Sequence, residues 1–528
     1  MRNKIVTAAV ALLAAAPAFS QNLNPQVQVT NDYKAELGKA GKQSVALEIP
    51  DSLNSFRTSV SYNVFATPYK GAYEFVPYEI NVTPQKPASD YSRLYLKAGA
   101  GYPLRPELKA VWTPVRSVSG NTLTVFQDLN GYIGNYGTLD SRDDYNGYDI
   151  FEKFGLEGRW FGNDFSLAYG LDYQGLFNND FTGKTNFNDF TLRTGVRSSE
   201  DSRILYDLDL EVSQAFDNAV TQTGVKARGG FLPNWMLPFD LRIDFNLETD
   251  IYGTDTYDNA FVAQVAAKAL FDWDPVRLAA GVSVSPASDF QWLYPDVELT
   301  ADLFDQSLQF YANVKGGQFV KGYTELKLED HWFNPAYTVE IKPTLERLNA
   351  SLGFRGSALK YFQYDIRGGW ASYSDAPLRS LTASVYAPPV LDCGIAYADY
   401  NVTFADADLH WKSPRFALDL SVGFKHTDIE LNDDYLDLPM LSGSVTAVYN
   451  WNSRIFAGVS CKGSTEQAAY TWSVPGFADL GLLGEYRFNG RFGVWANVGN
   501  LLCHNIAVSP LHVQKGIYFT GGISLNLR

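Results

Sequence analysis

Apolar and polar residues alternate with a period of two along most of the chain from about residue 93 onward. The clearest runs are 165–174, 239–248 and 416–425, where an aliphatic or aromatic residue stands at every second position and a small, polar or charged residue stands between. Successive side chains of a β-strand point to opposite faces of a sheet, so each run predicts a strand with one apolar and one polar face. The pattern therefore predicts an all-β protein.

Short polar turns and longer links alternate between these strands. Gly, Asn, Asp, Ser and Pro, which tight hairpins favour, mark turns at 162–163, 199–201, 274–275, 305–306, 413–414, 452–453 and 489–490. Longer links are expected at 135–149, 178–189, 315–348, 426–439 and 462–479. Outer-membrane barrels have short periplasmic turns and long extracellular loops, so this alternation predicts a transmembrane antiparallel up-and-down β-barrel.

The strand count favours a membrane barrel over a soluble one. About 22 strands (range roughly 18–24) fit between residues 91 and 528, because one strand and its connection take about 20 residues. The stretch 379–410 is the least regular, since Pro388 and Pro389 interrupt it. A barrel of this size has a lumen too wide for its own side chains to fill. We therefore expect apolar faces on lipid and polar faces in the lumen. A closed barrel also satisfies every backbone group without leaving an edge, and its lumen is then either occupied or conducting.

The N-terminal end has the pattern of a secretory signal peptide over residues 1–20. A basic start at 2–4 precedes a short apolar run at 5–16 and a small-residue cleavage site at 18–20. Export and a barrel together predict the outer membrane of a Gram-negative bacterium. Residues 21–90 are polar at first and rich in Pro near their end, so we expect them to stay in the periplasm and bind a partner, or to enter the lumen as a partial stopper.

Composition narrows the function classes. Aromatic residues make up 15% of the chain, which suits rings at a lipid interface. The formal net charge is −15, and the sequence has no basic stripe that could neutralise phosphates. The sequence therefore argues against nucleic acid as a partner. Cys393, Cys461 and Cys503 lack metal-type spacing. One disulfide could form among them, but the simpler interpretation is three small residues on barrel walls or loops.

No set of residues predicts catalysis, a cofactor or a metal centre. The chain has five His and no G-x-S-x-G elbow. Asp406, Asp408 and His410 share one face of a strand and could bind a metal, but a polar lumen lining is the favoured interpretation. Three loop aromatics, Tyr435, Trp472 and Trp332, are expected to be exposed, where they could stack on a sugar or face a neighbouring protein.

The closing hairpin resembles a known family. Residues 492–502 (FGVWANVGNLL) and 516–525 (GIYFTGGISL) are similar to the last two strands of TonB-dependent receptors, in which an Asn-Val-x-Asn-Leu signature precedes the final strand. The resemblance implies a receptor-like transport barrel, of the plug-poor kind found in the Bacteroidota. Residues 21–90 are too few for a full plug domain, and the chain ends without the usual terminal aromatic residue. Coupling to TonB is therefore doubtful. The best candidate for a TonB box is 27–30 (VQVT), and such a short pattern arises easily by chance.

Three functions remain open at this point. The first is a receptor-like transport barrel completed by a periplasmic protein or lipoprotein that supplies what the missing plug would. The second is a passive porin-type channel, in which the link at 315–348 folds inward as a constriction. The third is a structural barrel that anchors a secretion or assembly complex through residues 21–90. An enzyme is disfavoured because no catalytic set is present.

Overall fold

The fold is a closed antiparallel β-barrel. The computed structural model describes residues 93–527 apart from these short segments: 117–120, 140–143, 180–182, 200–201, 203, 234–238, 254–256, 286–291, 305–306, 338–339, 359–360, 384–390, 430–434, 470–472, 490 and 510. The signal peptide and the segment 21–90 expected from the sequence lie outside the described residues.

The wall strands are β1 (Leu94–Tyr102), β2 (Glu107–Arg116), β3 (Thr122–Gly137), β4 (Tyr145–Phe161), β5 (Phe165–Asn179), β6 (Lys184–Ser198), β7 (Ile204–Phe216), β8 (Thr221–Pro233), β9 (Asp240–Tyr252), β10 (Ala260–Trp273), β11 (Val276–Val284), β12 (Leu293–Asp302), β13 (Gln309–Phe319), β14 (Thr344–Ala358), β15 (Phe362–Ala383), β16 (Leu391–Lys412), β17 (Phe416–Asp428), β18 (Leu441–Trp451), β19 (Ile455–Ser464), β22 (Phe477–Arg487), β23 (Phe492–Gly499) and β26 (Tyr518–Leu527). The elements within connections are α2 (Tyr323–Glu329), η3 (Pro335–Tyr337), β20 (Gln467–Ala468), β21 (Ser473–Val474), β24 (Ile506–Ser509) and β25 (His512–Gln514). In this part of the chain, no helix has the length and apolar character that a bilayer crossing requires.

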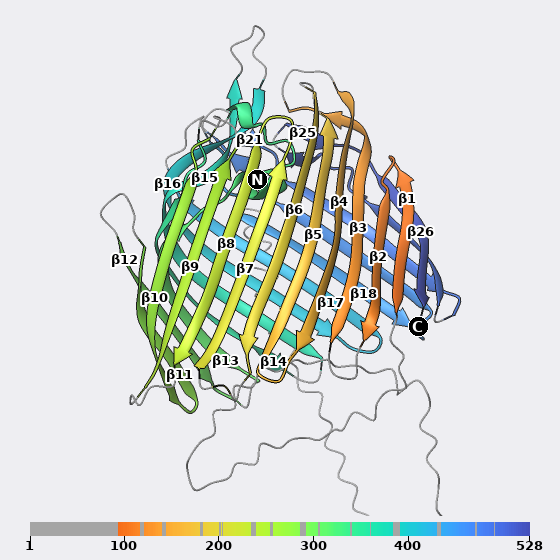
Figure 1. Cartoon of the computed structure of the whole chain (residues 1–528). Coiled ribbons are helices and arrows are strands. Elements are labelled where there is room, and N and C mark those ends of the chain that lie inside the picture. Colours follow the sequence, from red (N-terminus) through yellow and green to blue (C-terminus); the bar gives the residue numbers. More distant parts are fainter. Residues whose placement is uncertain are drawn as a thin grey trace, which may run out of the picture. The chain divides into compact units, whose positions relative to one another are not determined.

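The wall closes because its first and last strands pair. β1 runs antiparallel to β26 from Leu94 opposite Leu527 to Tyr102 opposite Phe519 (Figure 1). Each other wall strand pairs with the wall strands before and after it, so the 24-stranded sheet, less β24 and β25, is a ring of 22 strands. A ring leaves no unpaired edge, as the hydrocarbon core of a bilayer requires.

The two faces of the wall differ in polarity as the alternation predicted. On β5, Leu171 is 47% exposed on the outer face, whereas its neighbour Asp172 is 4% exposed on the luminal face. The three clearest runs of the sequence became β5, β9 and β17. Their apolar residues cover the outside of the barrel, where they contact lipid, and their polar residues line the lumen.

Aromatic rings mark the end of the barrel with short turns. Exposed rings flank these turns at Trp160, Trp273, Phe304, Trp451 and Phe488. Such rings prefer the boundary between hydrocarbon and headgroups, so this end lies at one membrane interface. Because the turns here are short, it is the periplasmic end.

The predicted turns separate paired strands, but several predicted link boundaries are wrong. The links expected at 135–149 and 178–189 shrink to 138–144 and 180–183, because β3 to β6 continue past the expected boundaries. Strands β15 and β16 pair along 22 residues each, through the stretch 379–410 that seemed irregular. Pro388 and Pro389, which were expected to interrupt the pattern, lie outside the described residues.

Candidate functional site

The connection between β13 and β14 folds into the lumen. We call residues 320–343 the luminal loop; it contains α2 and η3. At one side, Nδ1 of His331 lies 2.9 Å from the carboxylate of Asp149 on β4. At the other, the Asn334 amide donates to the carbonyl of Cys393 on β16 at 2.9 Å. β4 and β16 are on nearly opposite sides of the ring, so the loop spans the barrel, as the channel hypothesis expected for residues 315–348.

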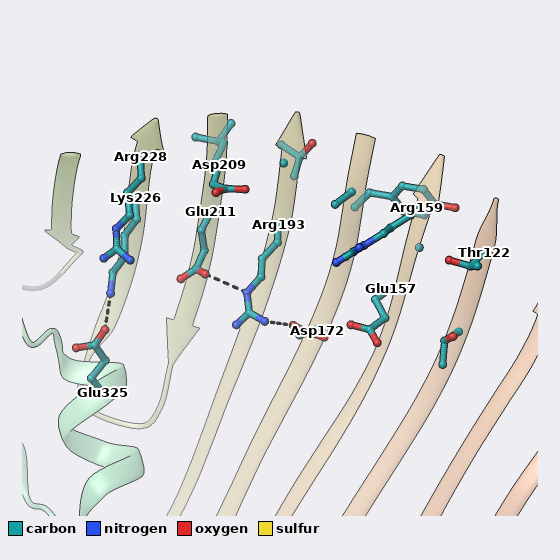
Figure 2. A pocket seen from close by; sticks show the side chains of 18 residues that line it. Thr122, Glu157, Arg159, Asp172, Arg193, Asp209, Glu211, Lys226, Arg228 and Glu325 are labelled. Carbon is teal, nitrogen blue, oxygen red and sulfur yellow. Dashed lines mark hydrogen bonds and ion pairs between the residues drawn. The ribbon is translucent and has the colours of Figure 1, made fainter. Parts of the chain in front are cut away.

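Helix α2 is fixed against the wall formed by β7 to β9. The amide and hydroxyl of Thr324 both donate to Oε1 of Gln222 on β8, at 2.9 and 3.0 Å. Glu325 forms an ion pair with Lys226, also on β8 (Figure 2). The Tyr323 hydroxyl donates to the carboxylate of Asp217, which follows β7. Burial raises the pKa of Tyr323 well above its usual range, and Asp217 raises it further. Tyr323 therefore stays a protonated donor at neutral pH.

A buried carboxylate ties the luminal loop to the far wall. Asp330 is 3% exposed and accepts a hydrogen bond from the Ser509 hydroxyl on β24 at 3.0 Å. Nε of Arg379 on β15 lies 3.9 Å from the same carboxylate, and the Arg379 guanidinium donates to the carbonyl of Glu329 at 2.8 Å. A buried charge is tolerated only with such partners, so Asp330 holds the loop and both neighbouring segments in one arrangement.

Apolar packing completes the attachment. Leu326, Phe333 and Ile341 of the loop belong to one buried cluster with the wall residues Leu176 and Phe187. The luminal loop and the wall thus share a small hydrophobic core inside the barrel, and this core fixes the position of the loop against the wall.

Trp332 is buried, which corrects the expectation that it is an exposed binding aromatic. It is 4% exposed and stacks on His512 of β25, with ring centroids 4.5 Å apart. Tyr136 of β3 meets it edge-on at 5.5 Å. Tyr435 is also buried, at 8% exposure, and Trp472 lies outside the described residues. Neither described ring is free to stack on a ligand.

The strand face that suggested a metal site is a polar lumen lining. The Asp406 carboxylate pairs with Arg367 at 2.9 Å, and Nδ1 of His410 lies 2.8 Å from Asp419. Among the described residues, no group of three or more His, Cys, Asp or Glu side chains is placed to hold a metal ion. None of the three cysteines forms a disulfide in the structure: Cys393 lies on β16, Cys461 on β19 and Cys503 in the connection after β23.

A recess opens in the luminal wall beside α2. It has a volume of about 800 Å³ and is lined by β3 to β8, with Glu325 of α2 at its edge (Figure 2). Arg193 lies in its middle and bridges Asp172 at 2.7 Å and Glu211 at 2.9 Å. Sequence reasoning missed this recess, because its residues come together only through the register of six strands.

Comparison with known proteins places the fold. No family model and no curated protein sequence matches the chain. Among solved structures, it is similar to the siderophore receptor PirA from Acinetobacter baumannii, with a TM-score of 0.57 and 9% identity over 82% of this chain and 80% of that one. A mutant of the ferric enterobactin receptor PfeA from Pseudomonas aeruginosa gives 0.56 and 9% over 82% and 81%, respectively. The copper transporter OprC gives 0.54 and 13% over 83% and 80%. At this identity the likeness establishes the fold alone, a receptor-like outer-membrane barrel.

Proposed function

We propose that the protein transports a polar solute across the outer membrane and that the luminal loop is its extracellular gate. The observation that carries this proposal is the attachment of one loop to nearly opposite walls, through Asp149 on β4 and Cys393 on β16. The loop leaves the barrel wall at the end with long connections, so it closes the mouth that faces outward. Beside the apolar cluster, the loop is attached to the wall by hydrogen bonds and ion pairs, and such polar contacts can be exchanged for contacts with a solute.

The gate can be tested by single-channel conductance of the full-length protein in a planar bilayer. Replacing residues 323–341 with a short Gly-Ser linker should raise the conductance several-fold, because the lumen loses its stopper. Shortening the connection between β11 and β12 at 286–291 serves as the matched control and should leave conductance low. Equal conductance of both variants and the unaltered protein would contradict a gating role.

A partner belongs to the same proposal. We infer that a periplasmic protein or lipoprotein binds residues 21–90 and supplies the work of opening the gate. The receptor-like fold supports this inference, but TonB coupling is not part of it. The inference is supported if the full chain recovers a partner and the chain lacking residues 21–90 does not.

The passive channel is the second candidate, favoured by the same inward loop. It requires steady conductance of the full chain without any partner. The bilayer experiment on the unaltered protein therefore separates the two, because a gated transporter stays silent until its loop is released.

A further inference from the structure

The floor of the luminal recess is made of small residues. In the register of the wall, Arg159 on β4 lies opposite Ala168 on β5, Ala168 opposite Gly195 on β6, and Gly195 opposite Asp209 on β7. In the next luminal row, Gly170 also lacks a side chain, and a Cβ placed there would meet its nearest atom, the carbonyl oxygen of Leu156, at an ordinary contact distance of 3.5 Å. Between Arg159 and Asp209 the luminal face of the wall therefore carries little or no side chain, and this creates the recess.

Two charges of opposite sign stand at the ends of this floor. Among the described residues, neither Arg159 nor Asp209 forms an ion pair, whereas Arg193 beside them is held by two carboxylates. Figure 2 shows the long Arg159 side chain reaching over the floor from β4 and Asp209 facing it from β7. A Cβ on Gly195 would meet Oδ1 of Asp209, so this carboxylate lies over the floor, one strand nearer to Arg159.

The spacing suits a short peptide. Three strand steps of about 4.8 Å separate the Cα atoms of Arg159 and Asp209 by about 14 Å, and both side chains shorten the gap. With the Asp209 carboxylate one strand step nearer, about 10 Å remain to the Cα atom of Arg159, and the flexible Arg159 side chain takes up part of this distance. An extended chain covers about 3.3–3.6 Å per residue, so a ligand of two residues, or of three at most, spans the gap. Glu157, which lines the same recess from β4, would repel a second negative charge and disfavour dicarboxylates.

We propose that this recess binds a small zwitterion of peptide type, with its carboxylate on Arg159 and its ammonium group on Asp209. The proposal rests on the transport function inferred above and names the solute class. A charged guanidinium and a carboxylate form stronger hydrogen bonds with ionised partners than with neutral ones, so both termini of the ligand must be charged. The volume of the recess lies in the range of small-molecule sites.

Isothermal titration calorimetry on the detergent-solubilised full-length protein tests the proposal. Trialanine should bind saturably, and N-acetyl-trialanine amide, which lacks both charges, should not. Arg159→Gln and Asp209→Asn should each weaken binding by at least about fivefold. Gly170→Leu should abolish binding by filling the floor. Asp408→Asn on β16 and Lys462→Gln on β19 remove luminal charges elsewhere and should leave the affinity unchanged.

Three results would overturn the recess assignment: no binding of trialanine, equal binding of the blocked peptide, or equal weakening by the two control variants. Each variant is first checked for an unchanged β-type circular dichroism spectrum, so that loss of binding is not loss of fold. Calorimetry does not require the gate to move. If trialanine does not bind but replacing the luminal loop raises the conductance, only the solute class is refuted. If trialanine binds but replacing the loop leaves the conductance unchanged, only the gate is refuted.

Discussion

Asp330 is a buried carboxylate of the luminal loop with partners on two other elements, Ser509 on β24 and Arg379 on β15. Asp330→Ala removes the partner of the Ser509 hydroxyl and of Arg379. A buried donor left without an acceptor costs about 1–3 kcal/mol. We expect higher conductance and faster proteolysis within residues 320–343, while the barrel keeps its resistance to SDS. Asp258→Ala removes an exposed loop carboxylate and is the matched control. Unchanged proteolysis of the Asp330→Ala protein would show that other contacts hold the loop.

The contacts of single residues were the part least predictable from the sequence. Asp330 and Ser509 are 179 positions apart, and His331 and Asp149 are 182 apart. A local pattern contains no information on such partners. Trp332 illustrates the consequence: it was expected to be exposed, but His512 of β25 and Tyr136 of β3, both distant in the sequence, pack against it and bury it.

At the scale of elements, helix α2 is held to β8 by charge. Glu325→Lys places two positive charges together, because Lys226 is the partner of Glu325. We expect this change to release α2 and raise conductance. The double variant Lys226→Glu with Glu325→Lys restores opposite charges and should return conductance towards its original value. Because each single change also alters the net charge of the lumen, the cycle of all four proteins is needed, and additive effects would argue against a direct pair.

Element type was predictable because the period of two is present within each strand, and turn residues mark where strands end. Element length was not, since β15 and β16 continue for 22 residues each with no change in local preference. The register between strands was not predictable either, because it depends on both partners and on the stagger of the whole barrel. The candidate recess therefore stayed hidden, although the polar character of its residues was expected.

Closure is a property of the whole molecule, and it depends on the seam between β1 and β26. Gly522 on β26 lies so close to β1 that a Cβ there would overlap the carbonyl oxygen of Ala98. Backbone atoms cannot move aside as a flexible side chain can, so we expect the added methyl group to destabilise the barrel by about 1–3 kcal/mol or more. Gly522→Ala should lower the temperature at which the barrel loses its SDS-resistant mobility on a gel.

Gly484→Ala separates this effect from the general cost of replacing a glycine in a strand. The nearest atom to a Cβ at Gly484 is 3.9 Å away, so the added methyl group fits without strain. Alanine also restricts the unfolded chain more than glycine does, so this control should be neutral or slightly stabilising. If both variants melted alike, the seam would be wide enough for a side chain and the pairing of β1 with β26 would be looser than the structure has it. If only Gly522→Ala melted early, the ring would be limited by its seam, because the other strand pairs are joined by a covalent turn or loop and this one is held by backbone hydrogen bonds and packing alone.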